Sequence, residues 1–403
     1  MALIGVLLFV LLLVISVAIH EFGHLLTAKA FGMKATEYFI GFGPKIWSFR
    51  RGETEYGLKA LPAGGYVKII GMTDLETVSE ADAPRAFYRF SALRRLVVLS
   101  AGSISHMIVA FVMFLVVLSG FGSSVADTTI ATVAPCVPAV NATAAGCAAT
   151  DPASPAKAAG LLPGDRVVAV GPTRITSWDQ AAKAIRAAGP GALAITVERN
   201  GQQLTVNPDL VARERPDLDN PAKTVNVGVL GIEPSSHTVR AGAWAGIKGS
   251  GRLIGETVKA SVLALAHIPG KIPNLISSLD GGHRDQGGLV GVVGAARISG
   301  ETFSTQHATI GERLSSVLIN VGALNVFIGL FNALPLLPLD GGHMAVVGYE
   351  SVRSRFYRRL GRADPGRVDM SKLLPVAYAF LFVLVGLTVL LVAADLVNPV
   401  KLS

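Results

Sequence analysis

The stretch Ile15-Ser16-Val17-Ala18-Ile19-His20-Glu21-Phe22-Gly23-His24 places two imidazoles and a carboxylate inside an apolar run. On a helix, His20 and His24 lie on one face, so a ring nitrogen of each can point at one metal ion. Glu21 lies beside them, where it can handle protons. The pattern H-E-x-x-H is typical of zinc hydrolases. A chance surface pair is the alternative, but ionisable groups in an apolar span are costly and usually functional.

The composition indicates a polytopic membrane protein. Of 403 residues, 51% are hydrophobic and only 16% are charged. The net charge is +8, but the basic residues are concentrated beside apolar segments and are not interleaved with aromatic residues. This distribution favours a membrane-orientation signal over nucleic-acid binding.

Apolar runs predict an α-helical membrane protein with four transmembrane helices. No positive charge precedes the first run, so we expect it to stay in the mature protein and not to be a cleaved signal peptide. Lys29 and Lys34 follow the first run, which puts the amino terminus outside and the motif towards the cytoplasm. The predicted spans are residues 1–30, 93–120, 313–343 and 373–403.

Residues 31–92 are expected to form a cytoplasmic or membrane-associated β-hairpin region and a connection. Aromatic and β-branched residues punctuated by Gly and Pro predict short strands and turns. The stretch Gly64-Gly65-Tyr66-Val67 belongs to this region. Such a hairpin can pair with an extended substrate, or it can be a small sheet that only packs. The pattern leaves both open.

Residues 121–236 are expected to form an extracytoplasmic α+β domain. A short helix that turns at Gly160, a helical pattern over residues 178–188 and two strands joined by Asn200-Gly201 resemble a PDZ domain. Such a domain can bind a peptide ligand or restrict access by its bulk, and both remain open. If this domain is outside the cell, a disulfide between Cys136 and Cys147 is expected.

The segment 237–312 is expected to contain an interfacial amphipathic helix over residues 240–280, broken near Pro269-Gly270, and then a flexible Gly-rich loop over residues 281–296. Residues 344–372 are expected to be a basic cytoplasmic loop. In the second span, His106 is either a hydrogen-bond partner of a neighbouring helix or a ligand or acid, and we favour the structural role.

The third span leads into Asn332-Ala333-Leu334-Pro335-Leu336-Leu337-Pro338-Leu339-Asp340-Gly341-Gly342-His343. Prolines and paired glycines break a helix, which is tolerated at membrane depth only where the backbone is buried or lines a cavity. Asp340 is therefore the natural third ligand. The first and third spans both run from outside to inside, so Asp340 can meet His20 and His24.

Together these motifs resemble the site-2 protease family of intramembrane zinc metalloproteases, in its bacterial RseP-like branch with actinobacterial relatives. The resemblance implies His20, His24 and Asp340 as zinc ligands, Glu21 as catalytic base, and Asn332 as a substrate-contacting residue. It covers nearly the whole chain. Where members often have Gly-Pro and Asn in the second span, this chain has Gly102-Ser103 and His106, and Pro338 falls one place later than usual.

The resemblance implies cleavage within single-pass transmembrane proteins such as anti-sigma factors, in regulated proteolysis at the bacterial cell membrane. One alternative is a membrane-anchored zinc protease that cuts cytoplasmic or misfolded proteins. Another is an inactive PDZ-based scaffold. Histidine and aspartate can also bind other divalent ions. The expected partners are the bilayer, the substrate and a possible PDZ ligand, and not nucleic acid.

Overall fold

The computed structural model of the protein describes residues 1–72, 77–138, 147, 151–216, 224–279, 289–305 and 308–399. It divides into two compact units. The first contains residues 1–121 and 241–402, and the second contains residues 122–240. Each unit is described by itself.

Four helices of the first unit are long and apolar enough to cross a membrane, which confirms the predicted class of membrane protein. Their spans are Ala2–Ala30, Ala92–Phe121, Ile310–Asn332 and Met370–Val397. The helices of this unit are α1 (Ala2–Ala30), α2 (Ala92–Leu115), the π-helical turn η3 (Val116–Phe121), α5 (Ala243–Leu279), α6 (Val292–Phe303), α7 (Ile310–Asn332), α8 (Asp340–Arg359) and α9 (Leu374–Val397), with short 3-10 turns η1 (Ala83–Arg85), η2 (Phe87–Arg89) and η4 (Met370–Leu373).

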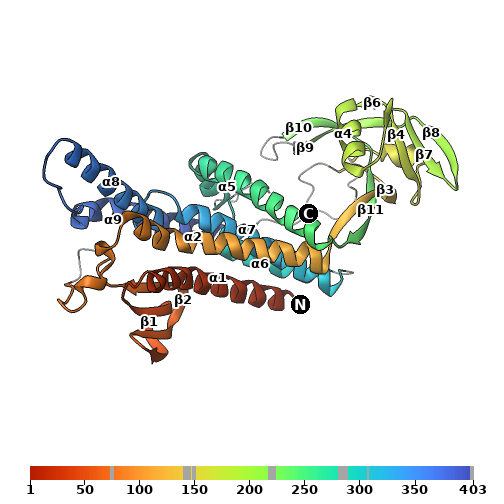
Figure 1. Ribbon diagram of the computed structural model, residues 1–403. Coiled ribbons are helices and arrows are strands. Elements are labelled where there is room, and N and C mark those ends of the chain that lie inside the picture. The colour runs from red at the N-terminus through yellow and green to blue at the C-terminus, as the bar shows by residue number, and fades with distance from the viewer. Residues whose placement is uncertain are drawn as a thin grey trace. The chain divides into compact units, whose positions relative to one another are not determined.

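Helix α1 packs against α2, α6 and α7, and α2 packs against α7 (Figure 1). Small residues allow the backbones to approach closely. A Cβ on Gly5 of α1 would lie 2.5 Å from the Cβ of Phe303 in α6, and a Cβ on Gly300 would lie 2.9 Å from the carbonyl oxygen of Ala2. Such contacts are the usual way in which helices pack in lipid, where no hydrophobic force drives them together.

Two expectations for the connecting segments were wrong, and a third was wrong in part. Helix α5 does not break near Pro269-Gly270. It continues through Pro269 and Pro273 and packs against α2, α7 and α9. Packing against neighbours outweighs the loss of a backbone donor at each proline. The expected Gly-rich loop is helical from Val292 in α6, and its residues 281–288 lie outside the described residues. The basic segment after Asp340 is largely the helix α8.

Asp395 of α9 caps the N-terminus of α6. Its buried carboxylate oxygen Oδ2 accepts hydrogen bonds from the backbone N–H groups of Gly291, at 3.0 Å, and Gly294, at 2.8 Å. The first turn of a helix leaves its N–H groups without partners inside the helix, and a carboxylate there satisfies them and favours the helix dipole. The fourth span is thereby joined to α6, which itself packs on α1.

The antiparallel strands β1 (Ala35–Arg51) and β2 (Thr54–Ile69) form a two-stranded sheet with several register shifts. Gly41 and Gly43 have positive φ angles of 92° and 83°, which a residue with a side chain rarely adopts. The distal part of the sheet exposes large apolar side chains, namely Phe42, Ile46, Trp47, Phe49, Leu58 and Leu61. The proximal part is fixed to α1 by the Tyr38 hydroxyl, which donates to the Ala18 carbonyl at 2.8 Å.

The second unit is an α+β domain whose strands form a six-stranded and a three-stranded sheet. Its helices are α3 (Pro155–Ala158) and α4 (Trp178–Ala188). Its strands are β3 (Ser123–Val133), β4 (Arg166–Val170), β5 (Thr173–Arg174), β6 (Gly191–Ala192), β7 (Ile195–Arg199), β8 (Gln202–Val206), β9 (Asp209–Pro216), β10 (Thr224–Val229) and β11 (Ile232–Val239). As the sequence predicts, Asn200 and Gly201 join β7 to β8 with positive φ angles of 53° and 79°.

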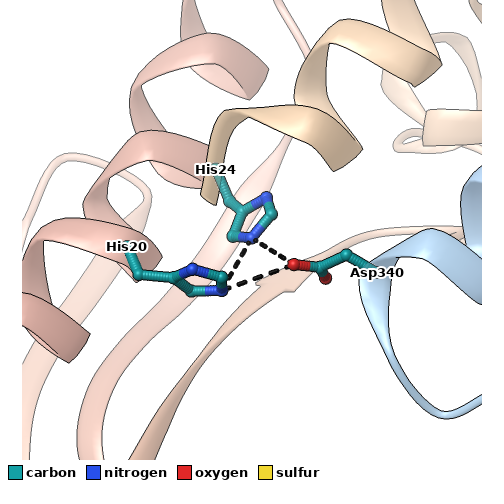
Figure 2. A group of neighbouring side chains, drawn as sticks. All are labelled: His20, His24 and Asp340. Atoms are coloured by element: carbon teal, nitrogen blue, oxygen red, sulfur yellow. Dashed lines mark hydrogen bonds and ion pairs between the residues drawn. The ribbon is translucent and has the colours of Figure 1, made fainter. Parts of the chain in front are cut away.

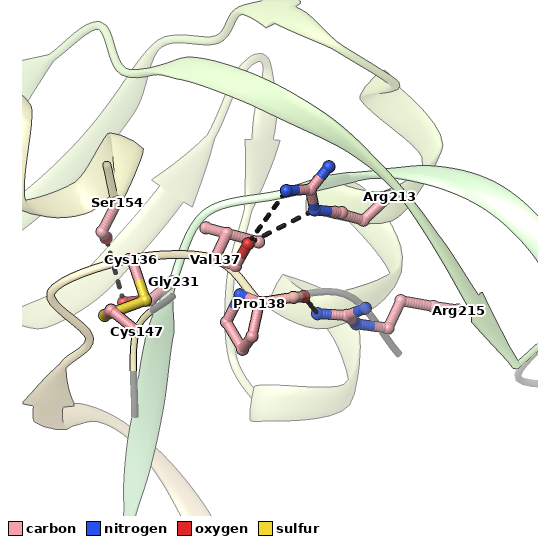
Figure 3. Close-up of a disulfide and its surroundings, with 8 residues drawn as sticks. All are labelled: Cys136, Val137, Pro138, Cys147, Ser154, Arg213, Arg215 and Gly231. Carbon is pink, nitrogen blue, oxygen red and sulfur yellow. Dashed lines mark hydrogen bonds between the residues drawn. A yellow bond between two sulfur atoms is a disulfide. The ribbon is translucent and has the colours of Figure 1, made fainter. Parts of the chain in front are cut away.

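A disulfide joins Cys136 to Cys147 (Figure 3). The chain next to Cys136 is held on β9 by two arginines. Arg213 donates to the Val137 carbonyl, and Arg215 donates to the Pro138 carbonyl at 3.1 Å. The disulfide-bonded segment is therefore anchored to the domain by side-chain hydrogen bonds to its backbone.

An ion pair between a buried carboxylate and a partly exposed arginine holds the turn before β4. Arg199 donates to both carboxylate oxygens of Asp165 at 2.7 Å and also to the Gly160 carbonyl. Asp165 is 1% exposed and accepts a further bond from the Leu162 N–H group. Burial raises the pKa of the Asp165 carboxyl, but the bonds from Arg199 and Leu162 outweigh it, so the pKa lies below its usual value.

We predict that Asp165→Asn lowers the free energy of unfolding of this domain by about 2 kcal/mol, because a buried charged hydrogen-bond network is broken. A carboxyl with a lowered folded-state pKa stabilises above its unfolded-state value of about 3.9, so the effect is complete at pH 7 and disappears as the pH falls below about 4. Hydrogen exchange of residues 122–240 in the full chain measures it.

The matched control is Glu198→Gln, which removes the solvent-exposed ion pair with Arg166 and should cost less than about 1 kcal/mol. Equal effects of the two substitutions at pH 7 would contradict the structural role of the Asp165 network.

Candidate metal centre

The imidazoles of His20 and His24 project from one face of α1 and are both buried (Figure 2). Their Nε2 atoms are 3.2 Å apart. The i and i+4 spacing on a continuous helix accounts for this arrangement, as the sequence predicts.

Helix α2 orients these rings. The Nδ1 atom of His24 lies 2.7 Å from the Val98 carbonyl oxygen. A carbonyl only accepts, so Nδ1 carries the proton and the lone pair of Nε2 points towards His20 and Asp340. A Cβ on Gly102 would lie 2.3 Å from His20 Cε1 and 2.4 Å from His24 Nε2. Gly102 is therefore required for the rings to fit against α2.

Asp340 is the first residue of α8 and follows the turn that ends α7. The two glycines after it let this turn fold back on the helix. A Cβ on Gly341 would lie 2.2 Å from the Leu334 carbonyl oxygen, and a Cβ on Gly342 would lie 2.6 Å from the backbone nitrogen of Leu337. Side chains at these two positions would clash with the turn, so the paired glycines allow the Asp340 carboxylate to lie against α1.

The carboxylate oxygen Oδ2 of Asp340 lies 3.4 Å from His20 Nε2 and 3.3 Å from His24 Nε2 (Figure 2). This oxygen is buried, and in the described part of the chain it has no hydrogen-bond partner. Tetrahedral ligands about 2.0–2.1 Å from Zn²⁺ are separated by about 3.3–3.4 Å. The three distances match this separation, so the donor set fits zinc.

Glu21 lies against strand β2. A Cβ on Gly65 would lie 2.8 Å from Glu21 Cγ. The absence of a side chain at Gly65 therefore leaves room for Glu21. It also brings the β2 backbone to the carboxylate that the sequence predicts as the base.

The other residues predicted to contact substrate are placed differently. Gly64 has a φ angle of 142° and lies beside the Phe42 ring. The Tyr66 hydroxyl donates to Glu37 at 2.6 Å and accepts from Lys59, so Tyr66 holds the sheet together. Val67 packs in the apolar cluster between the sheet and α2. Asn332 is the last residue of α7, and its side chain has no hydrogen bond within the described residues.

His106 has the structural role that the sequence favours. Its Nδ1 lies 2.7 Å from Asn325 Oδ1 in α7, while the Asn325 amide nitrogen donates to the Val321 carbonyl and to the Ser16 hydroxyl in α1. Since Asn325 uses its donors on these two acceptors, Nδ1 of His106 carries the proton. This network joins three spans, and the His106 ring lies 4.8 Å from that of His20.

Sequence reasoning missed Val98, Gly102, Asn325 and the contact of Gly65 with Glu21. A carbonyl acceptor such as Val98 has no sequence signal. Gly102 and Asn325 do have one, because a glycine and an amide inside apolar spans are unusual and indicate a close contact or a hydrogen bond between helices.

Comparison with known proteins agrees with this geometry. The model of the family described as peptidase family M50 matches residues 8–363. The zinc metalloprotease Rip1 of Mycobacterium tuberculosis is 35% identical over 405 residues, which cover 99% of this chain and 98% of that protein.

More distant relatives carry a similar description. The zinc metalloprotease Rip1 of Mycolicibacterium smegmatis is 34% identical over 99% of this chain and 98% of its own length. A putative zinc metalloprotease of Brucella suis is 31% identical over 86% of this chain and 85% of its own. With its apolar helices and zinc-compatible donor set, the chain belongs to peptidase family M50, the site-2 protease family, and is an integral-membrane zinc metalloprotease.

Proposed function

We propose that the protein is an intramembrane endoprotease that cuts single-pass transmembrane substrates, such as anti-sigma factors, in regulated proteolysis. The observation that carries this proposal is the convergence of His20 and His24, inside the first candidate span, with Asp340 just after the third. A hydrolytic centre built within a span acts on peptide bonds that lie at membrane depth.

We propose His20, His24 and Asp340 as the zinc ligands and Glu21 as the general base. Zinc bound by three protein ligands lowers the pKa of a water molecule and polarises a carbonyl. Glu21 accepts the proton of the attacking water and returns it to the leaving amine. The Asn332 amide is proposed as an additional donor to the carbonyl oxygen of the scissile bond.

Strand β2 is proposed to hold the substrate. A transmembrane helix hides its amide groups in its own hydrogen bonds, so it must unwind before cleavage. The backbone at Gly65 passes beside Glu21, and together with the preceding Gly64 it offers main-chain partners to an unwound segment. The continuation through Tyr66 and Val67 is proposed to align the same segment.

The proposed orientation puts the amino terminus outside and the metal centre towards the cytoplasmic side of a bacterial cell membrane. Lys29 and Lys34 after the first span and the arginines of residues 353–367 support it. The domain of residues 122–240 is then extracytoplasmic. Its disulfide between Cys136 and Cys147 supports an oxidising location.

The extracytoplasmic domain is proposed to be PDZ-like and to select or exclude substrates. Strand β10 lies at the end of its sheet, beside helix α4. A strand edge next to a helix is the arrangement with which PDZ domains add a peptide strand. Restriction of substrate access by the bulk of the domain alone is the second candidate role.

The proposal predicts that Glu21→Gln retains zinc and lowers the cleavage rate by about 10²–10⁴-fold, because general base catalysis is lost. Purified full-length protein is reconstituted with synthetic transmembrane peptides, the cut is mapped by mass spectrometry, and zinc is measured in parallel. The matched control is Glu256→Gln on the exposed surface of α5, which should cut at the normal rate. Cuts only outside the peptide's span would instead indicate a membrane-anchored protease.

The ligand assignment predicts that Asp340→Asn weakens zinc affinity by at least about tenfold, since changes around a site already cost about 10–100-fold. The fraction of zinc that stays bound at increasing chelator concentrations measures this affinity directly. Asp369→Asn, a change at an exposed carboxylate of the same unit, should behave as the unmodified protein does. Unchanged zinc retention in Asp340→Asn would point to a different third ligand.

A further inference from the structure

Helix α8 carries a row of exposed apolar side chains along one face. Tyr349, Val352, Phe356 and Leu360 are each more than half exposed, at 58%, 67%, 59% and 53%. Their spacing of three and four residues puts the first three on one side of α8, and Leu360, which follows the last residue of the helix, continues the row. We call these four residues the α8 stripe. Helix α8 is not one of the four candidate spans.

Arginines border the α8 stripe. At about 100° per residue, Arg353 lies at one edge of the stripe and Arg359 at the other, with Arg355 next to Arg359. A helix with aromatic and aliphatic residues on one face and basic residues beside them is typical of a helix at a membrane surface.

A polar cavity of about 350 Å³ lies on the face beyond Arg355, between α8, the start of α2 and residues 364–367. Four guanidinium groups line it, against two carboxylates. The charged lining residues are Arg95, Arg355, Arg358, Arg367, Glu350 and Asp364. The cavity is therefore positive overall.

Both carboxylates are already engaged within the protein. Glu350 accepts from Arg95 and from the Val368 N–H group, each at 2.9 Å. Asp364 accepts from the Gly366 N–H group at 3.0 Å and from the Ser354 hydroxyl at 2.9 Å, and these bonds hold the pKa of its carboxyl below the usual value.

Two of the arginines keep donors for a ligand. Within the described part of the chain, Arg355 has no ion pair or hydrogen bond, and Arg358 bonds only to the Ser354 carbonyl of its own helix. Guanidinium groups pair with phosphate through two parallel hydrogen bonds and are the preferred side chains for such anions.

We propose that this cavity binds the phosphate headgroup of an anionic phospholipid, whose acyl chains lie along the α8 stripe. Arg355 lines the cavity and Arg359, four residues later on the same side of the helix, borders the α8 stripe, so one amphiphilic ligand can occupy both. A free phosphate ion would occupy the cavity alone, and a zwitterionic lipid would not match the positive charge.

The lipid would act on the helix that presents the metal ligand. Helix α8 is continuous from Asp340 to Arg359, so a lipid bound near its C-terminal end fixes the orientation of the whole helix. Lipid binding itself does not depend on the proposed proteolysis.

The test counts lipids retained by the purified full-length protein in native mass spectrometry, with phosphatidylglycerol and phosphatidylcholine compared. We expect preferential retention of phosphatidylglycerol. The double substitution Arg355→Gln with Arg358→Gln should weaken it by about tenfold or more, since each basic residue near an anionic surface adds to the attraction. The control pair is Arg174→Gln with Arg252→Gln, which should retain the lipid normally.

A second pair of variants separates a lipid from free phosphate. Val352→Ser with Phe356→Ser should weaken phosphatidylglycerol retention. The same pair should leave unchanged the ability of inorganic phosphate to compete for the cavity. Retention unaffected by this pair would identify a phosphate site and overturn the lipid proposal. Equal retention of both lipids, or no difference between the arginine pair and its control, would overturn it as well. Zinc content and thermal unfolding confirm that each variant is folded.

Discussion

The structure depends on bringing His20 and His24, inside the apolar helix α1, together with Asp340, which follows the apolar helix α7. An imidazole or carboxylate at membrane depth is costly unless it finds a partner, and His20, His24 and Asp340 are partners for one another. Their donor atoms approach to 3.2–3.4 Å only because α1, α2 and the turn before α8 meet closely. The arrangement of the helices around this centre follows from that requirement.

Glycines make the close approach possible, and each faces a different part of the centre. Gly102 leaves room for the two imidazoles, Gly341 lets the turn fold under Asp340, and Gly65 admits the side chain of Glu21. Three separate segments of backbone therefore lie against these side chains. Backbone walls keep their position better than side chains, which is the condition for a preorganised site.

Much of this arrangement is readable from the sequence, because it depends on local patterns. The spacing of His20 and His24, the apolar spans and the Asn200-Gly201 turn are properties of a few neighbouring residues. The broken helix before Asp340 and the orientation of the two spans together predict that this residue lies near the histidines. The continuity of α5 through Pro269, the cap of Asp395 on α6 and the carbonyl of Val98 depend on segments distant in sequence, and a single sequence carries no pairing information for them.

The cap that Asp395 places on α6 has a consequence for assembly. The chain is made from its amino terminus, so α6 and all three proposed metal ligands emerge from the ribosome before Asp395 does. Until the last helix inserts, the amides of Gly291 and Gly294 lack their carboxylate acceptor. All residues of the proposed metal centre are thus synthesised before the helix bundle is complete. The last helix, α9, then fixes α6, the helix that packs on α1.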